Sequence, residues 1–259
     1  MMDDLQKKKL LQIGNIAGFI ATVIVNFLAV GLPLNNKTTK QLSDALPNLF
    51  VPAGITFSIW SVIYILLGVF AIYQAKDLFK QEKEDLSFLE EISFFFILSS
   101  IANVAWIFFW HYELVPLSLV MMLILFISLL ALYLRLDIGK GEASKQERNL
   151  IHLPISVYFG WITTATVANV TALLVSLNWD GFGIAEEIWA VVILIVVALI
   201  YVLTVITRKD IAYGLVGVWS TLGIVLKQIT ATPVVGITAL VVLIVIALAI
   251  TWIALNKVK

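Results

Sequence analysis

The chain contains no cysteine and only two histidines, and charged residues make up 13% of its 259 positions. The absence of cysteine excludes disulfides, zinc–thiolate sites and thiol catalysis. Two histidines make a histidine-rich metal site unlikely to form, so we expect neither a metal nor a cofactor. A formal net charge of zero gives no electrostatic basis for binding nucleic acid. The sequence also lacks a glycine-rich phosphate loop and a serine nucleophile elbow.

What the chain has in excess is apolar surface, because 61% of its residues are hydrophobic and its mean hydropathy is +1.02. Soluble domains average about 45–50% apolar and about 25% charged residues, so this composition predicts an integral membrane protein. A spanning helix needs about 20 apolar residues. Eight such segments are predicted, at residues 10–32, 52–75, 92–110, 114–134, 153–177, 188–206, 211–226 and 233–255. The predicted fold class is therefore all-α, a polytopic transmembrane helix bundle.

Lysine and arginine are distributed unevenly between the predicted loops. With eight spans, fourteen of these residues fall on one side of the membrane and three, Lys37, Lys40 and Lys227, on the other. Because positively charged short loops remain in the cytoplasm, we expect a multi-pass protein of the cell membrane with both termini cytoplasmic. An odd number of spans would break this alternation.

The connection at residues 33–51 differs from the two charged inner connections at residues 76–91 and 135–152, which are typical of solvated connectors. It carries several leucines, and Thr38-Thr39-Lys40-Gln41 is typical of the capped start of a short amphipathic helix. Such a loop could fold over the mouth of the bundle, or it could be a plain linker.

Three of the predicted helices carry aromatic and polar residues three or four positions apart, which places each set on one helix face. The sets are Phe57, Trp60 and Tyr64 in the second helix, Asn103 and Trp106 in the third, with Trp110 four positions further along the same face, and Tyr158, Trp161, Ala165 and Asn169 in the fifth. Together the three faces predict a pocket with aromatic walls and a few polar contacts. A pocket of this kind suits a flat, largely apolar ligand.

These residues also have purely structural interpretations. Tryptophan is enriched at membrane interfaces. Interface anchors are expected near span ends, at Trp110, Trp179, Trp189 and Trp252. Asn103 and Asn169 could instead bond across helices, a contact worth about 0.6–2 kcal/mol. The small residues of Gly14-x-x-x-Gly18 could form a homodimer face, although packing within the bundle is the favoured interpretation.

Three short motifs follow one another on the second, third and fifth helices. They are Pro52-Ala53-Gly54-Ile55-Thr56-Phe57-Ser58-Ile59-Trp60 with Tyr64 and Gly68, then Asn103-Val104-Ala105-Trp106, then Trp161, Ala165 and Asn169 at four-residue spacing. In this order they resemble the signature elements of the tryptophan-rich sensory protein family (TspO/MBR), which includes the mitochondrial translocator protein, or peripheral-type benzodiazepine receptor.

The resemblance implies a five-helix bundle over residues 10–177, followed by three additional transmembrane helices at residues 178–259. It also implies a cavity that binds porphyrins, sterols or synthetic aromatic ligands. Carried over to this chain, the cavity would be lined by Trp60, Tyr64, Asn103, Trp106, Trp161, Ala165 and Asn169. Ile55 replaces the first tryptophan of the family motif, so the porphyrin degradation described for some members is not expected here.

The leading hypothesis is a membrane receptor or sensor that binds a hydrophobic small molecule of the porphyrin or sterol class. The alternative is a transporter or facilitator of small hydrophobic solutes. An enzyme that modifies a tetrapyrrole ranks last, because the sequence offers no catalytic residues other than tryptophan. The expected partners are the hydrophobic ligand, the lipid bilayer and, through the glycine motif, a second copy of the chain.

Overall fold

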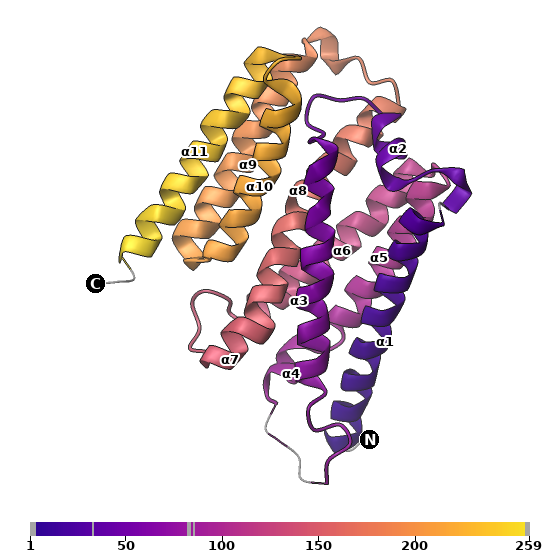
Figure 1. The fold of residues 1–259 in the computed structure, drawn as a ribbon, viewed down its shortest axis with the longest axis vertical. Helices are drawn as coiled ribbons and strands as arrows, with labels where there is room; N and C mark the ends of the chain where they lie inside the picture. The colour runs from indigo at the N-terminus through magenta and orange to yellow at the C-terminus, as the bar shows by residue number, and fades with distance from the viewer. Residues whose placement is uncertain (1–3, 33, 82–83, 85, 257–259) are drawn as a thin grey trace. The chain divides into compact units, whose positions relative to one another are not determined.

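The computed structural model describes residues 4–32, 34–81, 84 and 86–256. This part of the chain is helical and contains no strand (Figure 1). Seven of its helical segments are long and apolar enough to cross a membrane, and an eighth apolar helix, α5, has 17 residues. The expected all-α polytopic bundle is confirmed. Three of the lysines used to predict the orientation, Lys83, Lys257 and Lys259, lie outside the described residues, and the orientation stays a prediction.

The chain divides into two compact units, one made of residues 1–38 and 61–158 and the other of residues 39–60 and 159–259. We call them unit 1 and unit 2 and describe each by itself. The division crosses two helices, α3 (Ile59–Gln74) and α8 (Leu153–Ser176), each of which continues from one unit into the other.

In unit 1, α5 (Phe95–His111) packs against α1 (Asp4–Gly31) and α6 (Val115–Arg135). Glycines of α1 permit a close approach. A Cβ atom at Gly14 would lie 2.5 Å from Ile97 Cδ1, and one at Gly18 would lie 2.8 Å from Ser100 Oγ. The glycine motif is therefore used for packing inside the unit, as the favoured interpretation predicted.

The third predicted helix, at residues 92–110, is interrupted near its start. A short helix, α4 (Phe88–Ile92), ends at Ser93, whose φ of 48° lies in the left-handed region, and α5 begins at Phe95. The prediction of one uninterrupted helix from residue 92 was therefore wrong.

The start of α8 is preceded by a short turn, α7 (Lys145–Glu147), which begins with a capping box between Ser144 and Glu147. A π-helical turn, Arg148–His152, then leads into α8.

In unit 2, α11 (Pro233–Asn256) packs against α9 (Glu186–Arg208) and α10 (Ile211–Gln228). The chain reverses between α9 and α10 at Lys209, whose φ is 54°, and Asp210 then caps α10 by accepting a hydrogen bond from the Tyr213 N–H. The seventh predicted span, at residues 211–226, is an 18-residue helix in the structure.

The connection ahead of α3 is also part of unit 2 and is firmly attached to it. It contains the expected short helix, α2 (Thr39–Asp44), and a 3₁₀ turn, Gly54–Ser58. Its backbone bonds to α10 through the Ala53 N–H and the Gly223 carbonyl, 2.9 Å apart, and through the Trp219 indole N–H and the Thr56 carbonyl, also 2.9 Å apart. Within residues 33–51 themselves, the Leu49 carbonyl accepts a hydrogen bond from Gln228 Nε2 of α10 at 3.2 Å. A plain linker would make no such bond, so that alternative was wrong.

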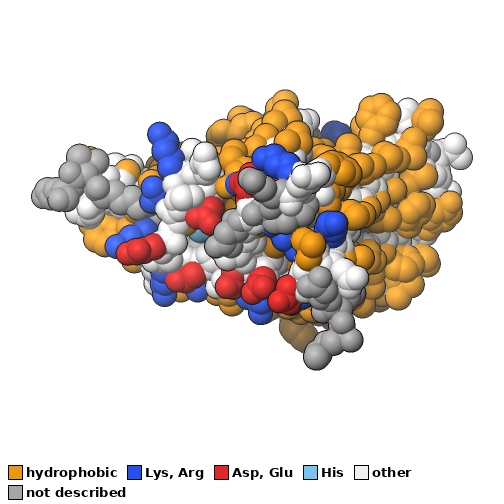
Figure 2. All heavy atoms as spheres, turned by 90° about the horizontal axis from the view of Figure 1, so that it is seen from below, with side chains coloured by type: hydrophobic (Ala, Val, Ile, Leu, Met, Phe, Trp, Pro, Cys, Tyr) orange, Lys and Arg blue, Asp and Glu red, His pale blue; other side chains and the backbone are white. Residues whose placement is uncertain are grey.

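Charged side chains gather around helix ends on the face shown in Figure 2, while hydrophobic side chains cover the flanks visible in that view. Many of these hydrophobic side chains are large and solvent-exposed, for example Phe27 at 70%, Ile72 at 76% and Leu248 at 63%. Large apolar side chains exposed along helices of this length are what a bilayer requires of spanning helices.

Candidate functional site

The nine residues predicted to line a ligand pocket fall in both units. Unit 1 contains Tyr64, Asn103, Trp106 and Tyr158, and unit 2 contains Phe57, Trp60, Trp161, Ala165 and Asn169. A single pocket formed by all nine therefore stays a prediction.

In unit 1, Asn103 of α5 joins three helices. Its Oδ1 accepts a hydrogen bond from Asn26 Nδ2 of α1 at 2.7 Å, and its Nδ2 donates to the Tyr158 hydroxyl of α8 at 3.1 Å. All three side chains are buried. Asn103 therefore forms hydrogen bonds across helices, as its structural interpretation predicted. These bonds hold its side-chain amide in one orientation.

Trp106 lies one turn beyond Asn103 and is stacked on Trp110, with the ring centroids 6.1 Å apart. Trp110 is only 5% exposed, so it packs within unit 1, and its interpretation as an interface anchor was wrong. The Trp106 side chain is buried and its indole N–H finds no acceptor among the described residues. Leaving a buried donor unpaired costs about 1–3 kcal/mol, so an acceptor brought by a ligand or a water would be favoured there.

In unit 2, Trp161 of α8 is the centre of an aromatic cluster. Its ring meets Phe57 and Trp60 edge-on, with centroid distances of 5.9 Å and 6.2 Å. Its buried indole N–H has no acceptor among the described residues, and the buried Thr56 hydroxyl in the same unit is likewise unpaired. Of the remaining predicted residues, Asn169 is buried and Ala165 is half-buried.

A cavity of about 250 Å³ opens elsewhere in unit 2, and none of the nine predicted residues lines it. Its walls come from the connection ahead of α3, the second half of α8, the α8–α9 loop and the start of α9. The principal lining residues are Asn48, Phe50, Thr171, Leu174, Trp179 and Trp189. The cavity therefore combines three aromatic side chains with one amide, one hydroxyl and the carboxylates of Asp180 and Glu186.

The aromatic wall is built by the α8–α9 loop. Gly181, at a φ of +64°, turns the chain so that its carbonyl accepts a hydrogen bond from Trp189 Nε1 at 3.0 Å. The Trp179 ring lies 5.1 Å from the Trp189 ring and meets Phe182 edge-on at 5.4 Å. Sequence analysis interpreted both tryptophans as interface anchors, whereas both are half-buried and line the cavity.

The floor is fixed by Asn48, which caps the turn that follows it. Its Oδ1 accepts hydrogen bonds from the N–H groups of Phe50 and Val51, each at 3.1 Å. The next carbonyl, that of Leu49, accepts a bond from Gln228 Nε2 of α10 at 3.2 Å. The cavity is consequently formed by a preorganised backbone rather than by a loose loop.

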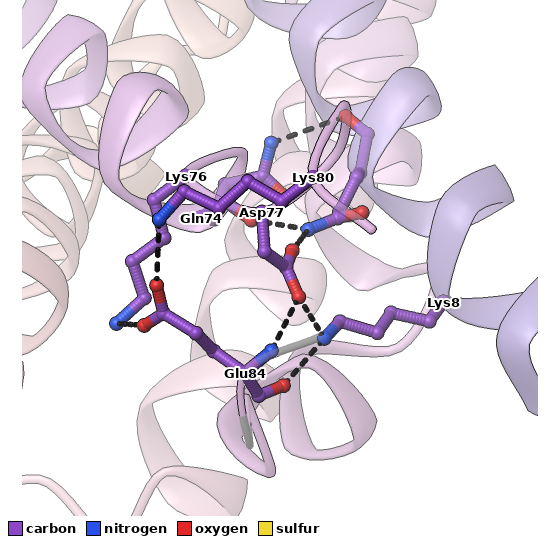
Figure 3. Close-up of polar contacts among 7 residues, drawn as sticks. Lys8, Gln74, Lys76, Asp77, Lys80 and Glu84 are labelled. Atoms are coloured by element: carbon purple, nitrogen blue, oxygen red, sulfur yellow. Dashed lines mark hydrogen bonds and ion pairs between the residues drawn. The ribbon is translucent and has the colours of Figure 1, made fainter. Parts of the chain in front are cut away.

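A second polar cluster closes one end of unit 1, at the junction of α1 with the end of α3 (Figure 3). The buried Asp77 carboxylate accepts hydrogen bonds from Lys8 Nζ at 2.5 Å, from Gln12 Nε2 at 2.7 Å and from the Glu84 N–H at 2.9 Å. Gln12 also donates to the Gln74 carbonyl at 2.8 Å. Sequence analysis interpreted residues 76–91 as a solvated connector, and burial of Asp77 contradicts this for its first part.

The charges of this cluster are mutually stabilised. Burial of the Asp77 carboxylate opposes ionisation, but the hydrogen bonds from Lys8, Gln12 and the Glu84 N–H outweigh burial and lower the pKa of Asp77 to about 2. Lys76 and Lys80 bond the Glu84 carboxylate and lower its pKa as well. Because every donor around Asp77 is engaged, we assign the cluster to stability rather than to proton transfer.

A family model described as TSPO-like protein matches residues 12–252. The match extends over α9, α10 and α11, so the similarity is not confined to the five helices that carry the motifs. The division into a five-helix bundle and three additional helices at residue 178 stays a prediction. Comparisons with curated proteins and with solved structures found no match.

Proposed function

The chain belongs to the TSPO-like family, and on that premise we propose that it is a membrane receptor or sensor for a flat, largely apolar small molecule of the porphyrin or sterol class. It is an integral membrane protein with several spanning helices. The ligand class follows the family resemblance, and the binding site is argued from this chain's own side chains.

The observation that carries the proposal is the cavity in unit 2. Ligand pockets are typically concave and mostly apolar, with a few polar groups that fix the orientation of the ligand. Phe50, Trp179 and Trp189 supply flat apolar walls. The polar groups of the lining include Asn48, Thr171, Asp180 and Glu186. Aromatic faces of this kind favour a planar or rigid ring system over a compact polar one.

The aromatic cluster of Phe57, Trp60 and Trp161 in unit 2 is the second candidate location for the same ligand. It is supported by the unpaired indole N–H group of the buried Trp161, which a ligand oxygen could satisfy. The two locations make different predictions for substitutions, which allows one experiment to separate them.

The experiment is a titration of the purified protein in maltoside micelles with protoporphyrin IX, followed by the Soret absorbance. Leu174 lines the cavity, and Leu174→Trp would fill it, so this change should weaken binding at least about tenfold if the cavity is the site. Leu177→Trp, one turn later on an exposed position outside the cavity, is the matched control.

Trp161→Ala is the third variant in this titration. If it weakens binding while Leu174→Trp does not, the ligand occupies the aromatic cluster of Phe57, Trp60 and Trp161. If neither change alters the affinity, or if the wild-type protein does not bind, the proposed function is wrong. A receptor should also show binding without movement of the ligand across proteoliposomes, whereas a facilitator should show flux.

A further inference from the structure

The cavity of unit 2 adjoins a second hollow of about 530 Å³ that is much more polar. The two share Asn48, Leu49 and Glu186 in their linings, so they adjoin along these residues. The second hollow, here called the polar groove, is lined by Asp44, Pro47, Asn48, Leu49, Glu186, Lys227, Gln228, Ala231 and Thr232. The cavity alone is at the small end of ligand-binding pockets, whereas cavity and groove together offer room for a larger molecule.

The charges in the groove are not all neutralised by one another. Asp44 forms an ion pair with Lys40, four residues earlier on α2. Lys227, on the last turn of α10, lies in the opposing fields of Asp44 and Lys40 and makes no hydrogen bond or ion pair with any described residue. Glu186, at the start of α9, likewise makes no hydrogen bond or ion pair with a described residue. The groove therefore presents one available positive and one available negative group.

From this arrangement we infer that cavity and groove form one site for a zwitterionic amphiphile. The apolar body occupies the space between Phe50, Trp179 and Trp189, the anionic group of the head pairs with Lys227, and the cationic group pairs with Glu186. The inference rests on the proposed function for the apolar body and adds the chemistry of the polar end.

Charge complementarity decides between the possible head groups. A purely anionic head would be drawn to Lys227 but repelled by Glu186, and a purely cationic head would meet the opposite conflict. A neutral head would leave the half-buried Lys227 ammonium without a counter-charge. Only a head that carries both signs satisfies both side chains at once.

The test uses three probes with the same cholic acid body and different heads. CHAPS carries an ammonium and a sulfonate, cholate carries a carboxylate, and a bis-gluconamide cholamide is neutral. Dissociation constants are measured by calorimetry in maltoside micelles. CHAPS should bind the wild-type protein most tightly of the three.

Substitutions then assign the two charges. Lys227→Gln should weaken CHAPS binding about fivefold and Glu186→Gln about threefold, as expected for partly exposed ion pairs. Glu186→Gln should also strengthen cholate binding, because it removes a repulsive charge. Glu187→Gln, at the neighbouring exposed position outside both hollows, and Lys209→Gln, at the other end of α9, are the matched controls.

The inference is overturned if cholate binds the wild-type protein as tightly as CHAPS, or if Glu186→Gln leaves CHAPS binding unchanged. Leu174→Trp separates this failure from failure of the proposed function. If it abolishes binding of all three probes while the charge variants have no effect, the apolar site stands and only the head-group assignment falls. If it changes nothing, the cavity is not the site.

A fourth probe, lysophosphatidylcholine, joins a zwitterionic head to a flexible chain. Tighter binding than CHAPS would identify a membrane lipid as the occupant, and weaker binding would identify a free molecule with a rigid ring body. Either order supports a zwitterionic amphiphile, provided that both probes respond to Lys227→Gln and Glu186→Gln.

Discussion

Replacing Asp77 by asparagine should destabilise the protein, because this change removes the charge at the centre of a buried network without changing the shape of the side chain. In the native protein the carboxylate accepts three hydrogen bonds, one of them from the Lys8 ammonium at 2.5 Å. The Asp77 side chain is fully buried and that of Lys8 is 18% exposed. An asparagine would present an N–H₂ group to at least one of these donors and leave Lys8 without its counter-charge.

The magnitude follows from the pKa of Asp77, which is about 2 in the folded protein and about 3.9 in an unfolded chain. This difference corresponds to about 2–3 kcal/mol of stability at neutral pH. Because the folded-state pKa is lowered, the contribution is fully present above about pH 4 and is lost as the pH falls from about 4 towards 2. Asp77→Asn should remove it at every pH.

The assay is equilibrium unfolding in maltoside micelles, followed by far-ultraviolet circular dichroism, for the wild type, Asp77→Asn and the exposed control Asp4→Asn. At pH 7 the free energy of unfolding of Asp77→Asn should be about 2–3 kcal/mol below the other two, and the gap should close as the pH is lowered through 4 to 2. Equal stability at pH 7, or a gap that persists undiminished near pH 2, would refute the account of this network.

Two further changes test the packing of unit 2. Gly217→Ala should lower the free energy of unfolding by about 1–3 kcal/mol, because its Cβ would lie 2.6 Å from a ring carbon of the fully buried Tyr201. The control Gly31→Ala should be tolerated, because no neighbouring atom lies closer than 3.6 Å to the added Cβ. Tyr201→Phe should lower the free energy of unfolding by about 1–2 kcal/mol, because it removes the hydroxyl that donates to the Gly160 carbonyl at 2.8 Å. The control Tyr112→Phe, at an exposed position, should leave the free energy of unfolding unchanged. Wild-type midpoints for Gly217→Ala and Tyr201→Phe would contradict this packing.

The helices were largely predictable because hydropathy over about 20 residues depends on composition alone. The break between α4 and α5 was not, because it rests on a left-handed backbone at Ser93, a residue type that seldom adopts it. Packing of Gly14 and Gly18 against α5 followed from residue size, since only small side chains let helix backbones approach so closely.

The candidate site was less accessible to sequence reasoning. Helical spacing identifies residues on one face but says nothing of where a loop will fold, so Phe57, Trp60 and Trp161 were selected while Trp179 and Trp189 were assigned to the interface. The available signal was local: Trp179 precedes Asp180-Gly181-Phe182-Gly183, a turn sequence that can bring nearby aromatic rings together. Burial of Asp77 depends on partners that lie 65 and 69 positions away in the chain, which no local pattern reveals.

The most direct test of the ligand-binding claim is an experimental structure of the protein determined with CHAPS present at a concentration above its measured dissociation constant. The account predicts density for the ring body between Phe50, Trp179 and Trp189, with its head directed towards Lys227 and Glu186. A cavity left empty under saturating conditions, or density confined to the apolar flanks of the helices, would contradict it.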